Sequence, residues 1–81
     1  MEHPEILKLV GSRIKELRES KGLTQVELVG KMEGNIDATN ISRIEAGRTN
    51  PTLLTLFRIA TALEINLHEL LLVTPPCNPA S

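Results

Sequence analysis

Apolar residues recur at helical spacing in the first quarter of the chain. Steps of three and four place five of them on one stripe of a helix: Ile6, Leu9, Val10, Ile14 and Leu17. The stripe predicts a helix over residues 4–21, with Pro4 in its first turn and Gly22 at its end. Gly11 lies inside this helix, where it costs roughly 1 kcal/mol relative to alanine.

A capping signal marks the start of a second helix. Thr24 is followed three residues later by Glu27, and this spacing fits a capping box, in which each side chain bonds the backbone N–H of the other residue. We therefore expect a short helix over residues 24–33. The Gly34-Asn35 pair that follows is typical of a turn.

Asp37 is the next candidate N-cap, a role that contributes about 1 kcal/mol. It predicts a third helix over residues 37–46, which turns Ile41 and Ile44 inward. Gly47 is expected to end this helix.

Two further helices are expected before the chain becomes rich in proline. Either Asn50 or Thr52 caps the fourth, and its buried side is predicted to carry Leu53, Leu56, Phe57, Ile59, Ala60 and Leu63. Asn66 caps a last short helix from Leu67 to about Leu72. No segment alternates like a strand, so the sequence predicts an all-α, five-helix domain over residues 1–73 and a flexible tail over 74–81.

The second and third predicted helices are separated by only about four residues. Such a connection forces a steep crossing, the geometry of a helix-turn-helix, and lets the second helix of the pair enter a major groove. Its outward residues near the N-terminus are Ala38, Thr39, Asn40 and Arg43. Arg43 has the donors to bind guanine O6 and N7. An ordinary solvated helix face would show the same polar pattern.

A group of motifs over residues 10–71 resembles the Cro/C1-type (XRE) helix-turn-helix family of bacterial and phage transcriptional regulators. The matching residues, in chain order, are Leu17-Arg18, Gly22-Leu23-Thr24-Gln25, Leu28, Ile41-Ser42-Arg43-Ile44-Glu45, Gly47, Asn50-Pro51 and Leu63. The order of these motifs is more specific than any one of them. The resemblance implies a five-helix, lambda-repressor-like fold whose third helix reads the major groove.

The resemblance also implies roles for individual residues. The base-contacting set is Ala38, Thr39, Asn40 and Arg43. The phosphate-contacting set is Thr24, Gln25, Ser42, Arg48, Thr49 and Asn50. Arg18 and Glu45 resemble a family pair that ties the first helix to the third, a structural role without DNA contact.

Two features differ from the family pattern. The stretch between Met32 and Ile41 is about two residues longer than the common spacing, and Val29 stands where a small residue is usual. Both differences point to a wider angle between the two helices, and they affect the base-contacting set more than the fold.

Composition narrows the class of nucleic-acid binder. The chain has 81 residues, enough for one domain, and a single aromatic residue, which disfavours stacking of bases on rings. Its net charge of −1 counts against a strongly electrostatic DNA binder. The placement of charge on one face matters more than the sum.

Other chemistry finds little support in the sequence. The lone Cys77 excludes an internal disulfide, and His3 and His68 lack metal-ligand partners. We expect no enzyme, no metal, no small-molecule cofactor and no membrane span, and a cytoplasmic protein.

The C-terminal segment is more apolar than one short helix needs. We predict a homodimer interface there, formed by Ile65, Leu67, Leu70, Leu71 and Val73, with packing against the first helix as the alternative. The sequence thus predicts a homodimeric regulator that reads a palindromic operator on double-stranded DNA. A protein-interaction or antitoxin-like module and a restriction-modification controller protein are the alternatives.

Overall fold

The computed structural model describes residues 3–73, with side chains from Glu5 onward. The tail expected at 74–81 and Cys77 lie outside the described residues. The five elements are α1 (His3–Ser20), α2 (Gln25–Lys31), α3 (Ala38–Glu45), α4 (Leu53–Leu63) and α5 (Leu67–Leu70). The described part contains no strand, so the predicted all-α, five-helix class is confirmed.

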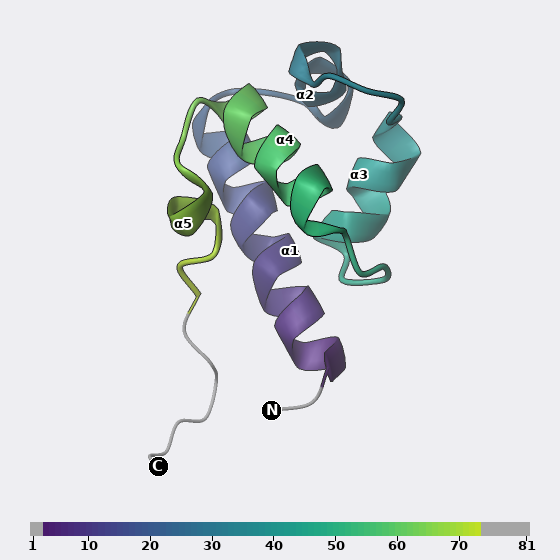
Figure 1. The fold of residues 1–81 in the computed structure, drawn as a ribbon, viewed down its shortest axis with the longest axis vertical. Coiled ribbons are helices and arrows are strands. Elements are labelled where there is room, and N and C mark those ends of the chain that lie inside the picture. Colours follow the sequence, from purple (N-terminus) through teal and green to yellow (C-terminus); the bar gives the residue numbers. More distant parts are fainter. Residues whose placement is uncertain (1–2, 74–81) are drawn as a thin grey trace.

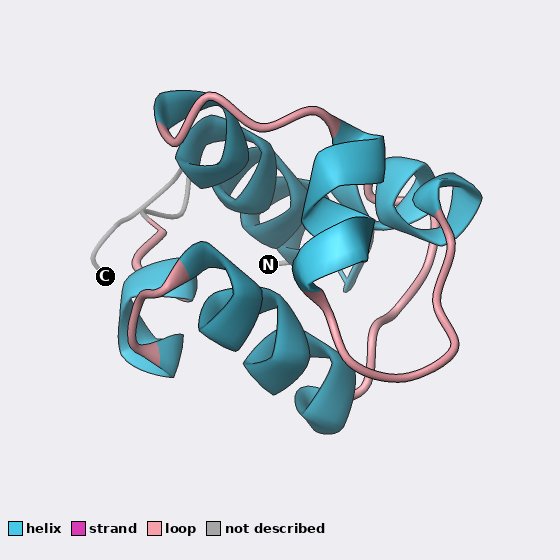
Figure 2. Ribbon diagram, turned by 90° about the horizontal axis from the view of Figure 1, so that it is seen from above, coloured by secondary structure: helices cyan, strands magenta, loops and turns pink. Residues whose placement is uncertain are grey.

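The longest helix, α1, links the two sides of the molecule (Figure 1). It contacts α3 on one side and α5 on the other, while α2 packs on both α3 and α4. Seen from above, α3 and α5 again lie at opposite sides (Figure 2). The recognition helix expected from the sequence is therefore separated from the C-terminal segment by the width of the domain.

Every helix contributes to one hydrophobic core. The largest fully buried side chains are Ile14, Leu28, Ile41, Ile59, Leu63 and Leu70. Burial of one such side chain stabilises the fold by about 1.5–3 kcal/mol. Ile41 and Ile44 both point inward, as the sequence predicts, so the opposite face of α3 is left to solvent.

Side-chain caps fix where the middle helices begin. The capping box is present: the Glu27 amide donates to Thr24 Oγ1 (3.1 Å), and the Thr24 amide donates to Glu27 Oε1 (2.8 Å). Asp37 Oδ1 accepts from the Asn40 amide at 2.9 Å. Thr52, rather than Asn50, caps α4 through the Thr55 amide (3.1 Å).

Three details of the helices differ from the sequence predictions. Leu53 and Phe57 are exposed rather than buried, because the inward face of α4 is formed by Ile59, Ala60 and Leu63 and no other helix within residues 3–73 covers its outer face. In addition, α2 ends at Lys31 rather than near Glu33, and α5 ends at Leu70 rather than near Leu72.

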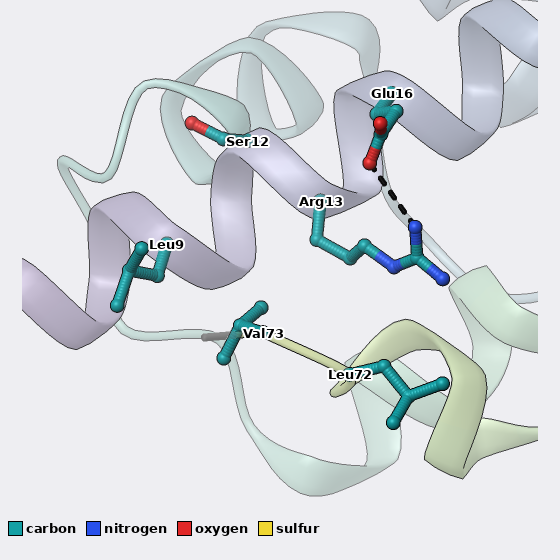
Figure 3. Close-up of a pocket in the computed structure, with 6 residues that line it drawn as sticks. All are labelled: Leu9, Ser12, Arg13, Glu16, Leu72 and Val73. Atoms are coloured by element: carbon teal, nitrogen blue, oxygen red, sulfur yellow. Dashed lines mark hydrogen bonds and ion pairs between the residues drawn. The ribbon is translucent and has the colours of Figure 1, made fainter. Parts of the chain in front are cut away.

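The segment after α5 returns to α1. Arg13 donates from Nε to the Glu69 carbonyl oxygen (3.1 Å) and from Nη1 to Glu16 Oε1 (3.1 Å), which ties α5 to α1. Leu72 and Val73 line a hollow with Leu9, Ser12, Arg13 and Glu16 (Figure 3). Within one protomer, the C-terminal segment therefore packs against α1, which is the alternative to a dimer interface.

Candidate nucleic-acid interface

The outward face of α3 is polar and open. Thr39, Asn40, Ser42 and Arg43 are exposed, and Ala38 is half-buried beside them. The Arg43 guanidinium forms no ion pair with any residue in the described range 5–73. Its donors are therefore available to a ligand, which for a guanidinium means a planar pair of acceptors such as O6 and N7 of guanine.

A buried ion pair holds the C-terminal end of α3 on α1. Arg18 Nε lies 2.7 Å from Glu45 Oε2 and Arg18 Nη2 lies 3.1 Å from Glu45 Oε1, a bidentate arrangement. The two side chains are only 8% and 3% exposed. The hydrogen bond to Glu45 raises the pKa of Arg18, so the guanidinium stays charged. Arg18 Nη1 also donates to the Leu23 carbonyl oxygen (2.6 Å), so the turn before α2 is bonded to the same arginine.

Gln25 joins this network from the first residue of α2. Its Nε2 donates to Glu45 Oε1 at 3.0 Å, and the side chain is half-buried. One amide hydrogen is thereby used inside the protein, while the amide oxygen and the second hydrogen form no hydrogen bond with residues 5–73. The glutamine is thus brought together with the Arg18–Glu45 pair, at the junction of α1, α2 and α3.

The backbones of α1 and α3 approach each other at Gly11. A Cβ atom added to Gly11 would lie 2.7 Å from the Glu45 carbonyl oxygen and 2.9 Å from the Glu45 carbonyl carbon. Real side chains do not reach such distances, so only glycine permits this approach. The residue that weakens α1 locally is what allows α3 to lie directly on it.

The loop after α3 gathers the other polar candidates. Gly47 has φ +73°, a conformation that favours glycine, and the Arg48 amide donates to the Arg43 carbonyl oxygen (2.9 Å). Arg48 and Asn50 are exposed and Thr49 is half-buried. Thr24, the last of the phosphate candidates, is exposed at the start of α2, with its hydroxyl used in the cap.

The structure adds a cation that sequence reasoning missed. A Cβ atom on Gly47 would lie 2.7 Å from Lys8 Cγ, so the exposed Lys8 side chain runs over the glycine next to Arg48. Lys8 is separated from this loop by about forty positions and lies on a helix of mixed charge. Only the contact between α1 and the loop could reveal it.

Most of the residues expected at a dimer interface are buried or half-buried within a single protomer. Leu70 is fully buried in the core, so within one protomer it has no surface to offer a partner. Ile65 and Leu67 pack against the core as half-buried side chains, and Val73 is half-buried. Leu71, which is 40% exposed, is the only member of the set with a largely open side chain.

A larger apolar surface lies on α4. Leu53, Leu54 and Phe57 are 65%, 55% and 55% exposed, and Phe57 lies four residues after Leu53 and three after Leu54, which makes it a neighbour of both on the helix surface. We call these three residues the α4 apolar face. Sequence periodicity assigned Leu53 and Phe57 to the core, so it concealed this surface.

Other chemistry is not indicated within the described residues. Between residues 3 and 73, no group of three His, Cys, Asp or Glu side chains could hold a metal ion. No helix in that range has the length and apolar character needed to cross a membrane.

Comparison with known proteins agrees with this geometry. A family model described as "Helix-turn-helix" matches residues 14–70. An uncharacterised helix-turn-helix transcriptional regulator of Sinorhizobium fredii is 44% identical over 68 residues, which cover 84% of this chain and 83% of that protein. The immunity repressor of Bacillus phage phi105 is 41% identical over 61 residues, 75% of this chain but only 41% of the repressor.

A solved structure is similar over nearly its whole length. The crystal structure of the restriction-modification controller protein C.AhdI from Aeromonas hydrophila superposes with a TM-score of 0.79 at 34% sequence identity. The match covers 86% of this chain and 99% of the controller protein.

Proposed function

We propose that this chain, which belongs to the Cro/C1-type helix-turn-helix family of DNA-binding transcriptional regulators, reads a specific base sequence through the outward face of α3. The observation that carries the proposal is the exposed Arg43, which has no ion pair among residues 5–73, on a helix whose last residue is held by a buried ion pair. Arg43 is the principal reader, by a bidentate contact to guanine, and Thr39 and Asn40 contact neighbouring bases. Ala38 permits close approach of the helix.

The phosphate contacts flank this helix. Gln25 and Thr24 lie at the N-terminus of α2, where free backbone N–H groups favour an anion. Ser42, on α3, and the loop residues Arg48, Thr49 and Asn50 serve a neighbouring part of the backbone. Gln25→Ala should therefore weaken binding to every DNA sequence alike, and a loss confined to one operator would contradict its role.

The functional unit is a homodimer that uses the α4 apolar face. A monomer rarely leaves a contiguous patch of large apolar side chains in water. The helix α4 begins three residues after Asn50, so a partner seated on this face lies close to the DNA-binding loop without covering α3. Two-fold symmetry then presents two copies of α3 to the two halves of a palindromic operator.

Two charge substitutions distinguish the α4 apolar face from the C-terminal segment. Leu54→Glu should shift the sedimentation coefficient to that of a monomer, because it places a charge in the interface. Leu72→Glu is the matched control: Leu72 is 60% exposed but outside the α4 face, so this variant should remain dimeric. If only Leu72→Glu dissociates the dimer, the interface lies on the C-terminal segment and not on the α4 apolar face.

Selection of bound DNA from a random pool tests the function itself. A palindromic motif is expected, with half-sites about one helical turn apart. Affinity for that motif should fall steeply between low and moderate salt, since phosphate contacts release counterions. Failure to retard any DNA at low salt would instead favour a protein-interaction module built on the same fold.

A second candidate function is control of restriction-modification genes. The likeness to the C.AhdI controller protein, at 34% identity and over 99% of its length, supports this role. If the protein has this function, the selected motif must occur upstream of restriction and modification genes in the source genome. A motif found only beside unrelated genes would remove this candidate while leaving sequence-specific DNA binding intact.

A further inference from the structure

The connection that leads into α3 is long and mostly exposed. It spans six residues, 32–37, between Lys31 at the end of α2 and Ala38 at the start of α3. Glu33, Gly34 and Asn35 are exposed, whereas Ile36 is half-buried against the core. Residues 33–35 thus form the exposed part of the connection, between Met32 and Ile36, which both pack against the core.

Gly34 takes a backbone conformation that side chains resist. Its φ is +100°, outside the range that other residues adopt readily. The space beside its Cα is also filled by a side chain from α4. An added Cβ would lie 2.9 Å from Arg58 Nη1, 3.2 Å from Cζ and 3.6 Å from Nε.

Three atoms of one guanidinium at these distances show that the flat group rests against the glycine. Arg58 is half-buried, and it has neither an ion pair nor a side-chain hydrogen bond to any of residues 5–73. Lys31 and Glu33 line the same hollow, beside Phe57 and Thr61, without pairing with it. The contact is therefore one of shape rather than charge neutralisation, and it is the φ of Gly34 that requires glycine at this position.

We propose that Arg58 is a positioning residue for DNA recognition: it presses on Gly34 and holds the connection so that α3 begins in one place. The proposal rests on the function proposed above, because it concerns the orientation of Ala38, Thr39 and Asn40. Base contacts require placement within about 0.5 Å, whereas phosphate contacts carry no sequence information. A loosened connection should thus weaken specific binding more than non-specific binding.

The planar group is the part that matters. Lysine keeps the charge of Arg58 but lacks the plane that covers the glycine. Arg58→Lys should therefore behave more like Arg58→Ala than like the unchanged protein. Lys31→Ala is the matched control, because it removes a cation from the same hollow without touching Gly34.

Hydrogen exchange on the full chain without DNA directly tests whether Arg58 holds the connection in place. In Arg58→Ala, the amides of Asn40 and Ile41, whose acceptor atoms belong to Asp37 at the end of the connection, should exchange about tenfold faster, while those of Ile14, Ile59 and Leu63 keep their protection. Unchanged exchange at Asn40 and Ile41 would overturn the proposal. Faster exchange throughout the chain would also overturn it, because Arg58 would then support the whole fold.

The ratio of affinities for the selected motif and for a scrambled duplex distinguishes a positioning residue from one that only supports the fold. Arg58→Ala and Arg58→Lys should each lose about tenfold in affinity for the selected motif and less than about twofold for a scrambled duplex. Equal losses on both duplexes, or a matching loss in Lys31→Ala, would make Arg58 a general cationic contact and overturn the proposal. If the unchanged protein binds no DNA, the proposed function fails. The exchange result still shows whether Arg58 holds the connection that leads into α3.

Discussion

At its C-terminal end α3 meets α1 backbone against backbone, whereas its N-terminal end follows an exposed connection. The first contact combines the bidentate Arg18–Glu45 pair with the approach at Gly11. The second depends on the Asp37 cap, the half-buried Ile36 and the guanidinium of Arg58. One helix is thus held rigidly at one end and lightly at the other.

The two ends carry different members of the base-contacting set. Ala38, Thr39 and Asn40 lie in the first turn of α3, whereas Arg43 lies in the last turn with Glu45. A firmly anchored C-terminal end fixes the axis of the helix on the domain. The lightly held end is where sequence changes can alter the contacts made with DNA without unfolding the protein.

The largest expected effect comes from breaking the buried pair. Glu45→Ala leaves the Arg18 charge buried without its partner, so the free energy of unfolding should fall by about 3–5 kcal/mol. Urea denaturation followed by circular dichroism measures this loss. Glu16→Gln is the control, because Glu16 is 70% exposed in its pair with Arg13 and its loss should cost no more than about 1 kcal/mol. Equal small effects would mean that the pair does not anchor α3.

The second effect concerns the close approach of α1 and α3. Gly11→Ala should destabilise the protein by about 1–3 kcal/mol, because the new methyl group meets the carbonyl group of Glu45. Gly30→Ala is the matched control on α2, where nothing lies within 4 Å of the new atom. It should stabilise the helix by about 0.5–1 kcal/mol. Thermal unfolding of both variants gives the signs, and a stabilising Gly11→Ala would contradict the packing described here.

The smallest effect on stability is expected at the lightly held end. Asp37→Ala removes the cap that accepts from the Asn40 amide, at a cost of about 1 kcal/mol. Because this cap holds only the first turn, the loss should appear as fraying of α3 rather than global unfolding. Amide exchange at Asn40 and Ile41 measures it. A loss as large as that of Glu45→Ala would erase the contrast between the two ends.

Local patterns in the sequence were enough to predict most of the fold. Caps at Thr24 and Asp37 depend on residues three positions apart, so they are visible in the chain itself. The family resemblance supplied the Arg18–Glu45 pair, which joins residues 27 positions apart. Periodicity failed at Leu53 and Phe57, because it cannot tell a core stripe from an apolar face that no other helix covers.

The parts of the site that the sequence did not reveal depend on contacts between distant elements. Lys8 lies beside Gly47, and Arg58 rests on Gly34, through packing of α1 and α4 on loops next to α3. Neither contact has a local signature. The close approach at Gly11 is similar. In the sequence this residue is only a glycine that weakens a helix, and the structure explains it by the carbonyl groups of Ile44 and Glu45, which lie against it from another helix.

The most direct test of the account is DNA selection carried out in parallel with the unchanged protein and Arg43→Ala. We expect one palindromic motif for both, with the preference lost at one base pair in each half-site for the variant and about 1–3 kcal/mol of affinity lost for the original motif. The unfolding free energy should stay the same, since Arg43 is exposed and unpaired in the described part of the chain. An identical motif from both proteins, with equal weakening on every sequence, would show that Arg43 contacts phosphate and that α3 does not read bases through it.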